Sequence, residues 1–272
     1  MSDAAQLKQE AEFFDRWAEE SIKKLQPIDP RIVDRYRSPG KWYPKEYCIT
    51  LLGDLRGKRI LDVGCGEGED AILLAKLGAI VTGFDVSPGA ISVAKRRAEI
   101  DGVSDRVSFI CAPLAEAQLP QGSFDVIWFD NILHHVLDEL DFVMRKILAS
   151  AKPGADLICI EPVNLNKTLR KIRFLVPVHT EVTPGERPLE KHDLAVIDNL
   201  VPVRRRHFLF LGRLIRFILG GYRYESAAFF QRLLADLVVA SDRVLLSLPR
   251  VEHLGGLAVM HGKIGPGPLD SR

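Results

Sequence analysis

The chain has 272 residues, a length that suits one α/β domain carrying an insertion. Hydrophobic residues make up 47% of it and charged residues 27%, which is typical of a globular protein, and 37 basic against 36 acidic residues leave no overall charge that would favour nucleic acid. The four cysteines lie far apart without CxxC or metal-ligand spacing, so we expect free thiols and no metal site.

The N-terminal segment lacks the charged region followed by an apolar one that marks a signal peptide. No stretch reaches the roughly 18 uncharged apolar residues that a membrane-spanning helix needs. We therefore expect a cytoplasmic protein that is not integral to a membrane.

The first 55 residues are predicted to form a helical cap. Apolar residues recur at helical spacing over residues 4–25, and Pro27 and Pro30 end that pattern. A second helix is expected over residues 46–55, after an aromatic loop.

Short apolar strands alternate with helices between residues 56 and 165. This alternation predicts βαβ units and a mostly parallel, doubly wound α/β sheet with helices on both faces. A first strand runs into a glycine-rich turn; the later strands are expected at 79–84, 107–111, 124–129 and 155–160, and the helices at 70–77, 88–101 and 138–151.

The rhythm breaks after Pro162, and the last strand-like run comes only at residues 256–264, before a short tail. We expect residues 166–255 to be a helical lid insertion, with 256–272 forming the last strand and tail. Residues 163–250 hold 15 Lys and Arg against 8 Asp and Glu, so the insertion is basic as well as apolar.

The strongest motif runs from Asp62 to Gly68, with the spacing G-x-G-x-G between a predicted strand and a helix. Glycines at such a turn let backbone amides approach a ligand closely. A dinucleotide site has G-x-G-x-x-G, but this chain has Glu69 at the third glycine position, followed by Asp70. Because carboxylates repel a pyrophosphate, these residues favour S-adenosylmethionine, whose amino and sulfonium groups are positive.

A further acidic residue, Asp85, ends the next predicted strand about twenty positions after the motif. A carboxylate there can accept hydrogen bonds from both ribose hydroxyls of a nucleoside. The spacing therefore agrees with the cofactor that the motif indicates.

Four segments within residues 56–165 resemble the class I S-adenosylmethionine-dependent methyltransferases, in particular the small-molecule branch that includes ubiquinone and menaquinone biosynthesis enzymes. The segments are ILDVGCGEG, GFDVSPGAISVAKRRA, LPQGSFDVIWFDNILHHV and KPGADLICIEP. The resemblance implies a Rossmann-like sheet of seven strands. It also implies that the glycine motif frames the methionine part of the cofactor, the acid after the second strand the ribose, and the turn after the fourth strand the sulfonium side. The residues so assigned are Asp62, Gly64, Cys65, Gly66, Gly68, Asp85, Val86, Asp130 and Asn131.

One departure from this branch concerns the adenine contact. Its members usually carry an acidic pair after the third strand, whereas this chain has Ile-Cys-Ala-Pro-Leu at residues 110–114. We expect adenine to be read by backbone groups or by Glu116.

Candidate catalytic residues follow the strands at the carboxyl edge, where open α/β sheets bind ligands. Methyl transfer needs at most a base for the acceptor proton, and histidine suits that role near neutral pH. We rank His135 first, then His134, then Glu161 at the end of the fifth strand and His179 in the insertion. Alternatively, the histidine pair caps the following helix or packs beneath the cofactor, and the other two are surface or structural residues.

The insertion and the N-terminal aromatic residues are expected to roof the acceptor site, which would suit a hydrophobic or amphipathic acceptor. The aromatic residues are Phe13, Phe14, Trp17, Tyr36, Trp42 and Tyr43. Alternatively, these side chains form the core of the lid itself. A third interpretation is peripheral contact of residues 204–223 with an anionic membrane surface.

These observations predict a methyltransferase (EC 2.1.1.-) for a small acceptor, with O-methylation in secondary or lipid and envelope metabolism as the leading hypothesis. N- or C-methylation, a dinucleotide-dependent oxidoreductase and a non-catalytic binding protein are the alternatives. Nucleic acid is not an expected substrate, because the turn at residues 130–133 lacks the Asn/Asp-Pro-Pro-aromatic form used for base amino groups.

Overall fold

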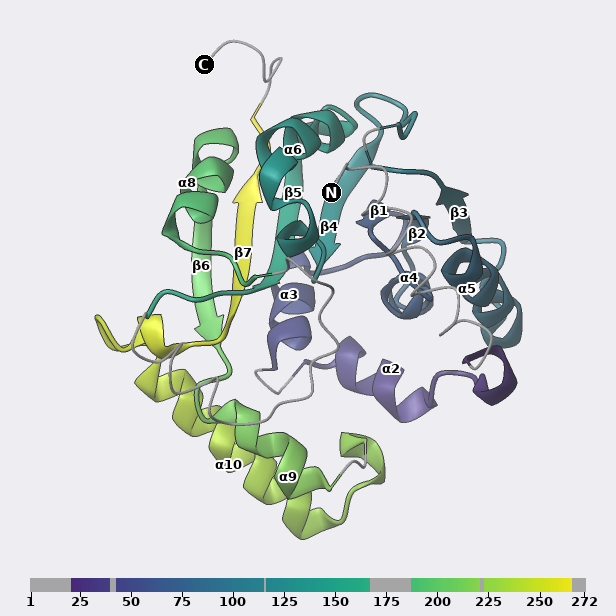
Figure 1. The fold of residues 1–272 in the computed structure, drawn as a ribbon. Helices are drawn as coiled ribbons and strands as arrows, with labels where there is room; N and C mark the ends of the chain where they lie inside the picture. The colour runs from purple at the N-terminus through teal and green to yellow at the C-terminus, as the bar shows by residue number, and fades with distance from the viewer. Residues whose placement is uncertain (1–20, 40–42, 115, 167–186, 221–222, 266–272) are drawn as a thin grey trace.

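A seven-stranded sheet forms the centre of the part of the chain that the computed structural model describes, namely residues 21–39, 43–114, 116–166, 187–220 and 223–265 (Figure 1). The strand order is β3-β2-β1-β4-β5-β7-β6, and β7 alone runs antiparallel to its two neighbours. The predicted fold class is confirmed. The strands are β1 Arg59–Val63, β2 Ile80–Asp85, β3 Val107–Cys111, β4 Phe124–Asp130, β5 Ala151–Pro162, β6 Val203–Phe208 and β7 Leu257–Lys263.

Helices cover both faces of the sheet (Figure 1). They are α2 Pro30–Arg37, α3 Pro44–Leu52, α4 Glu69–Lys76, α5 Pro88–Asp101, α6 Leu140–Leu148, α8 Lys191–Leu200, α9 Ile215–Leu219 and α10 Phe229–Leu245, and a 3-10 turn, η1, spans Leu133–His135. Most of the helix predicted over residues 4–25 lies outside the described residues, although residues 21–24 are helical. None of the described helices is long and apolar enough to cross a membrane.

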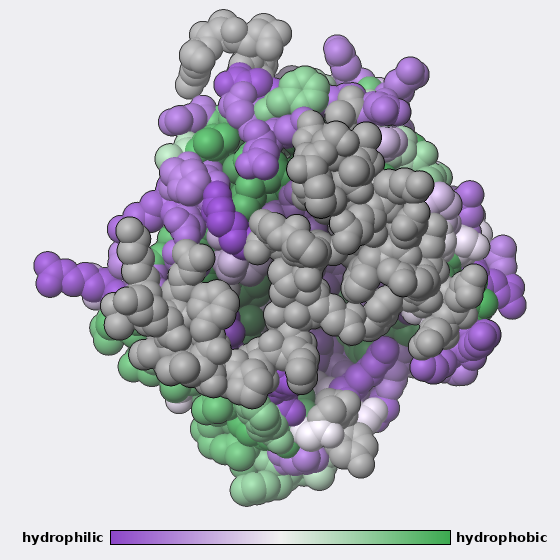
Figure 2. Space-filling model, viewed as in Figure 1, coloured by the Kyte–Doolittle hydropathy of each residue, from purple (hydrophilic) through white to green (hydrophobic). Residues whose placement is uncertain are grey.

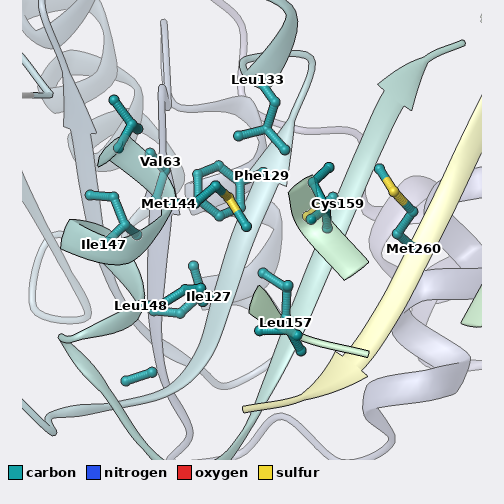
Figure 3. Packing of buried hydrophobic residues seen from close by; sticks show 14 of the residues in the cluster. Val63, Ile127, Phe129, Leu133, Met144, Ile147, Leu148, Leu157, Cys159 and Met260 are labelled. Carbon is teal, nitrogen blue, oxygen red and sulfur yellow. The ribbon is translucent and has the colours of Figure 1, made fainter. Parts of the chain in front are cut away.

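Alternating side chains of the central strands supply two buried layers. In β4, Ile127 and Phe129 face α6 and α8, whereas Val126 and Trp128 face α3 and α4. Figure 3 shows the first layer, with Met144 of α6 over Phe129. Strands buried on both faces read as continuous apolar runs, which is why the sequence showed them clearly.

One strand lies where the sequence analysis predicted a helical lid. Residues 203–208 form β6, the edge strand, and they pair with β7. Among the described residues of the insertion, α8, α9 and α10 are the α-helices. The three consecutive arginines fit a strand because an edge tolerates charged side chains: Arg205 pairs with Asp198, and the Arg206 guanidinium lies 4.7 Å from the Tyr47 ring centre.

Helices α9 and α10 form a hairpin beyond the carboxyl end of β6 (Figure 1). The buried carboxylate of Asp242 accepts hydrogen bonds from three successive backbone amides at one end of this hairpin, those of Phe210, Leu211 and Gly212, at 3.1, 2.6 and 2.8 Å. These bonds fix α10 to the turn that leads into α9.

Arg35 of α2 ties the hairpin loop to the N-terminal cap. Its guanidinium lies 2.9 Å from the fully buried carboxylate of Glu46 in α3 and 2.5 Å from that of Glu225, just before α10. Three tyrosine rings surround the guanidinium, with centres 5.0 to 5.9 Å away, those of Tyr36, Tyr43 and Tyr224. The cap and the hairpin therefore share one half-buried cation.

Candidate active site

The glycine motif forms a turn of left-handed residues between β1 and α4. Gly64, Gly66 and Gly68 have φ of +69°, +49° and +78°. A side chain at Gly64 would meet Ile132 at 2.5 Å, whereas no atom of the described residues lies within 4 Å of the position that a Cβ of Gly66 would take. The turn therefore leaves its backbone open at Gly66, where a ligand can approach closely.

Asp85, at the end of β2, is bound to this turn. Its carboxylate accepts a hydrogen bond from the Gly66 amide at 2.8 Å and another from the Ser87 amide at 2.9 Å. Burial raises the pKa of the Asp85 carboxyl, although these bonds oppose the shift. The next residue, Val86, is half-buried, so the predicted ribose contacts lie directly beside the open glycine.

Three carboxylates meet behind the motif, at the carboxyl ends of β1 and β4. The Lys45 ammonium group binds Asp70 and lies 3.0 Å from Asp130. Trp128 Nε1 donates to Asp70 at 3.0 Å, and Asp62 is 2% exposed. Three acids thus surround one lysine in a partly buried site.

The pKa values of these acids diverge. Burial raises the pKa of Asp62 well above its usual value, and the charges of Asp70 and Asp130 add to the effect. Burial likewise raises the pKa of Asp130 to about 7. Burial opposes ionisation of Asp70 as well, but Lys45 holds the pKa of that carboxyl below its usual value. The cluster would therefore ionise more readily beside an added cation.

The residues present fit S-adenosylmethionine. Asp62 Oδ2 is buried and finds no hydrogen-bond partner among the described residues, so it is an acceptor suited to the amino group. Asp130 lies at the end of β4, and the Asn131 side chain donates to it at 2.6 Å. The excess of acids over Lys45 suits the positive charge of a sulfonium. Cys65 of the motif is buried and follows Gly64 in the same turn.

A histidine and a glutamate are paired at the carboxyl ends of β4 and β5. His134 Nδ1 lies 2.9 Å from one carboxylate oxygen of Glu161. The other oxygen accepts from the backbone amides of Ile132 and Leu133 at 2.8 and 2.7 Å. Glu161 is fully buried, so it does not face the crevice as the sequence analysis expects. It holds η1 and the His134 ring instead.

The structure describes two of the three remaining candidates, His135 and Glu116. Burial, together with the neighbouring His134, lowers the pKa of His135 to about 4, and the two rings lie 4.2 Å apart. His179 lies outside the described residues. Glu116 is exposed, so its predicted contact with adenine stays a prediction.

A cleft opens between the hairpin and the start of α3. It is shallow, with a volume of about 20 Å³ that admits one water-sized molecule, and its walls are Tyr43, Phe208, Leu209, Ile215 and Val239, with Arg206 and Arg243 also lining it. Pro44 of the same lining directly precedes Lys45 of the acid cluster. The cleft therefore lies at the same edge of the sheet as the cofactor residues.

Sequence reasoning missed Lys45 and the structural use of Asp70. Lys45 is 25 residues from Asp70 in the chain, and Trp128 is 58 residues from it. The sequence analysis used Asp70 only as a carboxylate that would repel the pyrophosphate of a dinucleotide, and it predicted no structural partner for this residue. A lysine in the helix before β1 carries no local pattern that would have revealed its partners.

Comparisons with known proteins agree with this geometry. Residues 60–154 match the family model described as "Methyltransferase domain". The chain is 40% identical over 141 residues to a ubiquinone biosynthesis O-methyltransferase of Methylocella silvestris, covering 51% of this chain and 52% of that protein. It is 30% identical over 177 residues to the protein of that name in Vibrio parahaemolyticus, covering 64% and 68%. The chain spans about half the length of several curated relatives that it matches.

The fold also resembles solved structures. The crystal structure of the [4+2]-cyclase SpnF aligns with a TM-score of 0.55 and 24% identity, covering 84% of each chain, and at this identity the likeness shows the fold alone. The Vibrio parahaemolyticus relative is covered over two thirds of its length, and the matched family model includes the open glycine turn and the acids around it. The chain belongs to the class I S-adenosylmethionine-dependent methyltransferases, and S-adenosylmethionine is its cofactor.

Proposed function

We propose that this chain is an O-methyltransferase that acts on a hydroxyl group of a small hydrophobic or amphipathic acceptor. The pairing of His134 with Glu161 carries the proposal, because it equips the carboxyl edge of the sheet with a held base. The two relatives described above are named O-methyltransferases, which supports oxygen rather than nitrogen or carbon as the methylated atom.

The pairing sets the chemistry of His134. In the neutral ring, a proton on Nδ1 is donated to the Glu161 carboxylate, which leaves the lone pair of Nε2 for the acceptor. S-adenosylmethionine supplies a methyl group on a positively charged sulfur. Nε2 would take the proton that the acceptor hydroxyl gives up when its oxygen is methylated. Glu161 stabilises the resulting imidazolium.

His134 suits this role better than His135, reversing the order of the sequence analysis. A ring whose pKa lies near 4 is a weak base, and Glu161 orients only the His134 ring among the described contacts. The role of Glu161 is then positional. The apolar side chains around the shallow cleft favour contact with a hydrophobic acceptor, while its two arginines suit a polar or anionic substituent.

The test is methyl transfer from labelled S-adenosylmethionine to a panel of phenols and catechols with apolar side chains, with amine analogues of the same shape alongside. We expect methylated hydroxyl products and little transfer to the amines. Preferred transfer to amines would overturn the choice of oxygen. Failure to bind S-adenosylhomocysteine, with binding of NAD instead, would support the oxidoreductase alternative, and binding without transfer across the panel would support a non-catalytic binding protein.

A further inference from the structure

Helix α10 presents an apolar stripe to solvent. Its exposed large side chains recur three, four and seven residues apart, the spacing of one helical face. They are Phe230, Leu233, Leu234, Leu237 and Val244, with Phe229 beside them. Phe230 is 71% exposed and Phe229 74% exposed. Leu214 and Phe217, from η3 (Gly212–Leu214) and α9, extend the same apolar character to the other arm of the hairpin.

The orientation of this helix is the reverse of that in an ordinary surface helix. A surface helix turns its apolar face towards the core. In α10 the buried positions are Ala235 and the carboxylate Asp242, while the large apolar side chains point outwards. Figure 2 shows the resulting hydrophobic surface at the end of the molecule where α9 and α10 lie. An uncovered apolar area of this kind marks a contact surface.

The hairpin is held in this orientation at two places. Asp242 binds three backbone amides at the base of the hairpin, and Glu225 binds the half-buried Arg35 before α10 begins. In addition, Tyr224 donates to Asp236 at 2.9 Å. The apolar stripe is therefore part of the folded structure and does not depend on a partner to form.

The charge around the stripe is positive. Residues 209–250 contain six arginines and three acidic residues. The three acids, Glu225, Asp236 and Asp242, make the internal contacts just described, and none of them is among the exposed residues. The exposed charged side chains of the hairpin are arginines, among them Arg216 and Arg223.

We propose that the α9–α10 hairpin docks on an anionic membrane surface, with its apolar stripe in the boundary between headgroups and acyl chains and its arginines at the lipid phosphates. A large apolar face beside exposed basic residues is the pattern of an interfacial helix. Neither helix spans a bilayer. The contact surface therefore differs from the run 204–223 of the sequence analysis, because residues 203–208 belong to the sheet.

Charge also distinguishes a membrane from a second copy of this chain. Two copies that meet face to face through the same stripe bring arginines against arginines, because a twofold interface pairs identical surfaces. An anionic lipid surface instead complements every exposed arginine of the hairpin.

The experiment is co-sedimentation of the full chain with vesicles of phosphatidylcholine alone, or of phosphatidylcholine mixed with phosphatidylglycerol. We expect binding to the mixed vesicles that weakens as salt is raised. The double variant Phe230→Glu and Leu237→Glu should lower the vesicle-bound partition at least about tenfold. Its matched control is Phe142→Glu, which changes a phenylalanine 56% exposed on α6, away from the hairpin, and should bind like the parent chain.

A second pair of variants tests the charges. Arg216→Glu with Arg223→Glu should weaken binding and flatten its salt dependence, whereas Lys95→Glu with Arg106→Glu, exposed on and just after α5, should not. Affinity for S-adenosylhomocysteine shows that each variant is folded.

Three outcomes would overturn the proposal. The first is absence of binding to the anionic vesicles, and the second is equal loss in the Phe142→Glu control. The third is a parent chain that does not bind vesicles but forms a concentration-dependent dimer, which the Phe230→Glu and Leu237→Glu double variant abolishes. That result would make the hairpin a self-association surface.

Discussion

The region around β1 and β4 gathers three carboxylates about one lysine, whereas the hairpin beyond β6 carries arginines beside an uncovered apolar face. Both regions lie at the carboxyl edge of one sheet. In the first, burial raises the pKa values of Asp62 and Asp130, and a cationic ligand would favour their ionised forms. In the second, the carboxylates of Asp242 and Glu225 are engaged in internal contacts, and the positively charged arginines face the solvent.

This difference shows how one edge serves two kinds of partner. The cofactor region is preorganised by short contacts among residues that are far apart in the chain, so its ligand meets fixed charges. The hairpin is held in place by contacts at its two ends, those of Asp242 and Glu225. Its outer face therefore stays free to contact a large partner surface. We therefore expect substitutions in the first region to change chemistry and cofactor affinity, and those in the second to change docking and local stability.

The largest expected effect belongs to the chemistry. His134→Ala should lower kcat by about 10² to 10⁴-fold, because the acceptor loses its base. Affinity for S-adenosylhomocysteine should change little. The measurement is kcat against pH for the parent, His134→Ala and Glu161→Gln chains, in which Glu161→Gln should shift the pH profile as well as lower kcat. Equal rates in parent and His134→Ala chains would leave the ring a purely structural role.

The second effect concerns the hairpin. Asp242→Ala leaves three backbone amides without their acceptor and should lower the free energy of unfolding by about 2 to 4 kcal/mol. Hydrogen exchange of α9 and α10 should rise more than that of β4. Ser241→Ala, an exposed neighbour on the same helix, is the matched control. Uniform destabilisation of the whole molecule would mean that the two regions are one cooperative unit.

A smaller effect is expected at the ribose contact. Asp85→Ala should weaken S-adenosylhomocysteine binding by about 1 to 3 kcal/mol, because ribose hydroxyls and the Gly66 amide lose an acceptor. Titration calorimetry against Asp105→Ala, an exposed aspartate in the loop after α5, measures the difference. Unchanged affinity would remove Asp85 from the cofactor site.

The smallest effect is a dependence on pH. Because the pKa of Asp130 is raised to about 7, its carboxyl is mostly protonated near pH 6 and mostly ionised near pH 8. A bound cation favours the ionised form, so affinity for S-adenosylmethionine should rise by up to about tenfold over that interval and level off above it. S-adenosylhomocysteine has no sulfonium charge and should respond less. Asp130→Asn should remove the difference between the two ligands; a difference that persists would assign it elsewhere.

Local periodicity predicted most of the sheet and its helices. Residues 88–101 form α5 with the bounds expected from the sequence, and β3 spans the expected residues 107–111. Both elements show a repeating apolar pattern bounded by turn residues, and burial on both sides reinforces that pattern. The glycine turn and Asp85 were likewise visible because neighbouring residues in the chain form them.

Long-range contacts explain what local patterns did not predict. Strand β6 contains three arginines in a row and acquires its conformation from pairing with β7, more than fifty residues later. Lys45 and Trp128 reach Asp70 from separate elements. The Glu161 side chain turned towards His134, 27 residues away, where the sequence suggested a carboxylate facing the crevice. No spacing in the chain records such pairings.

The contact of Arg35 with both Glu46 and Glu225 bears on how far this lid can be exchanged between relatives. A hairpin that carries no acid at the position of Glu225 would leave Arg35 with Glu46 as its remaining acidic partner among the described contacts. Glu46 directly follows Lys45, so strain introduced at the graft would appear next to the acid cluster that receives the cofactor. A working chimera therefore has to transfer helices α2 and α3 together with the hairpin, since these segments form one exchangeable unit although the chain separates them widely.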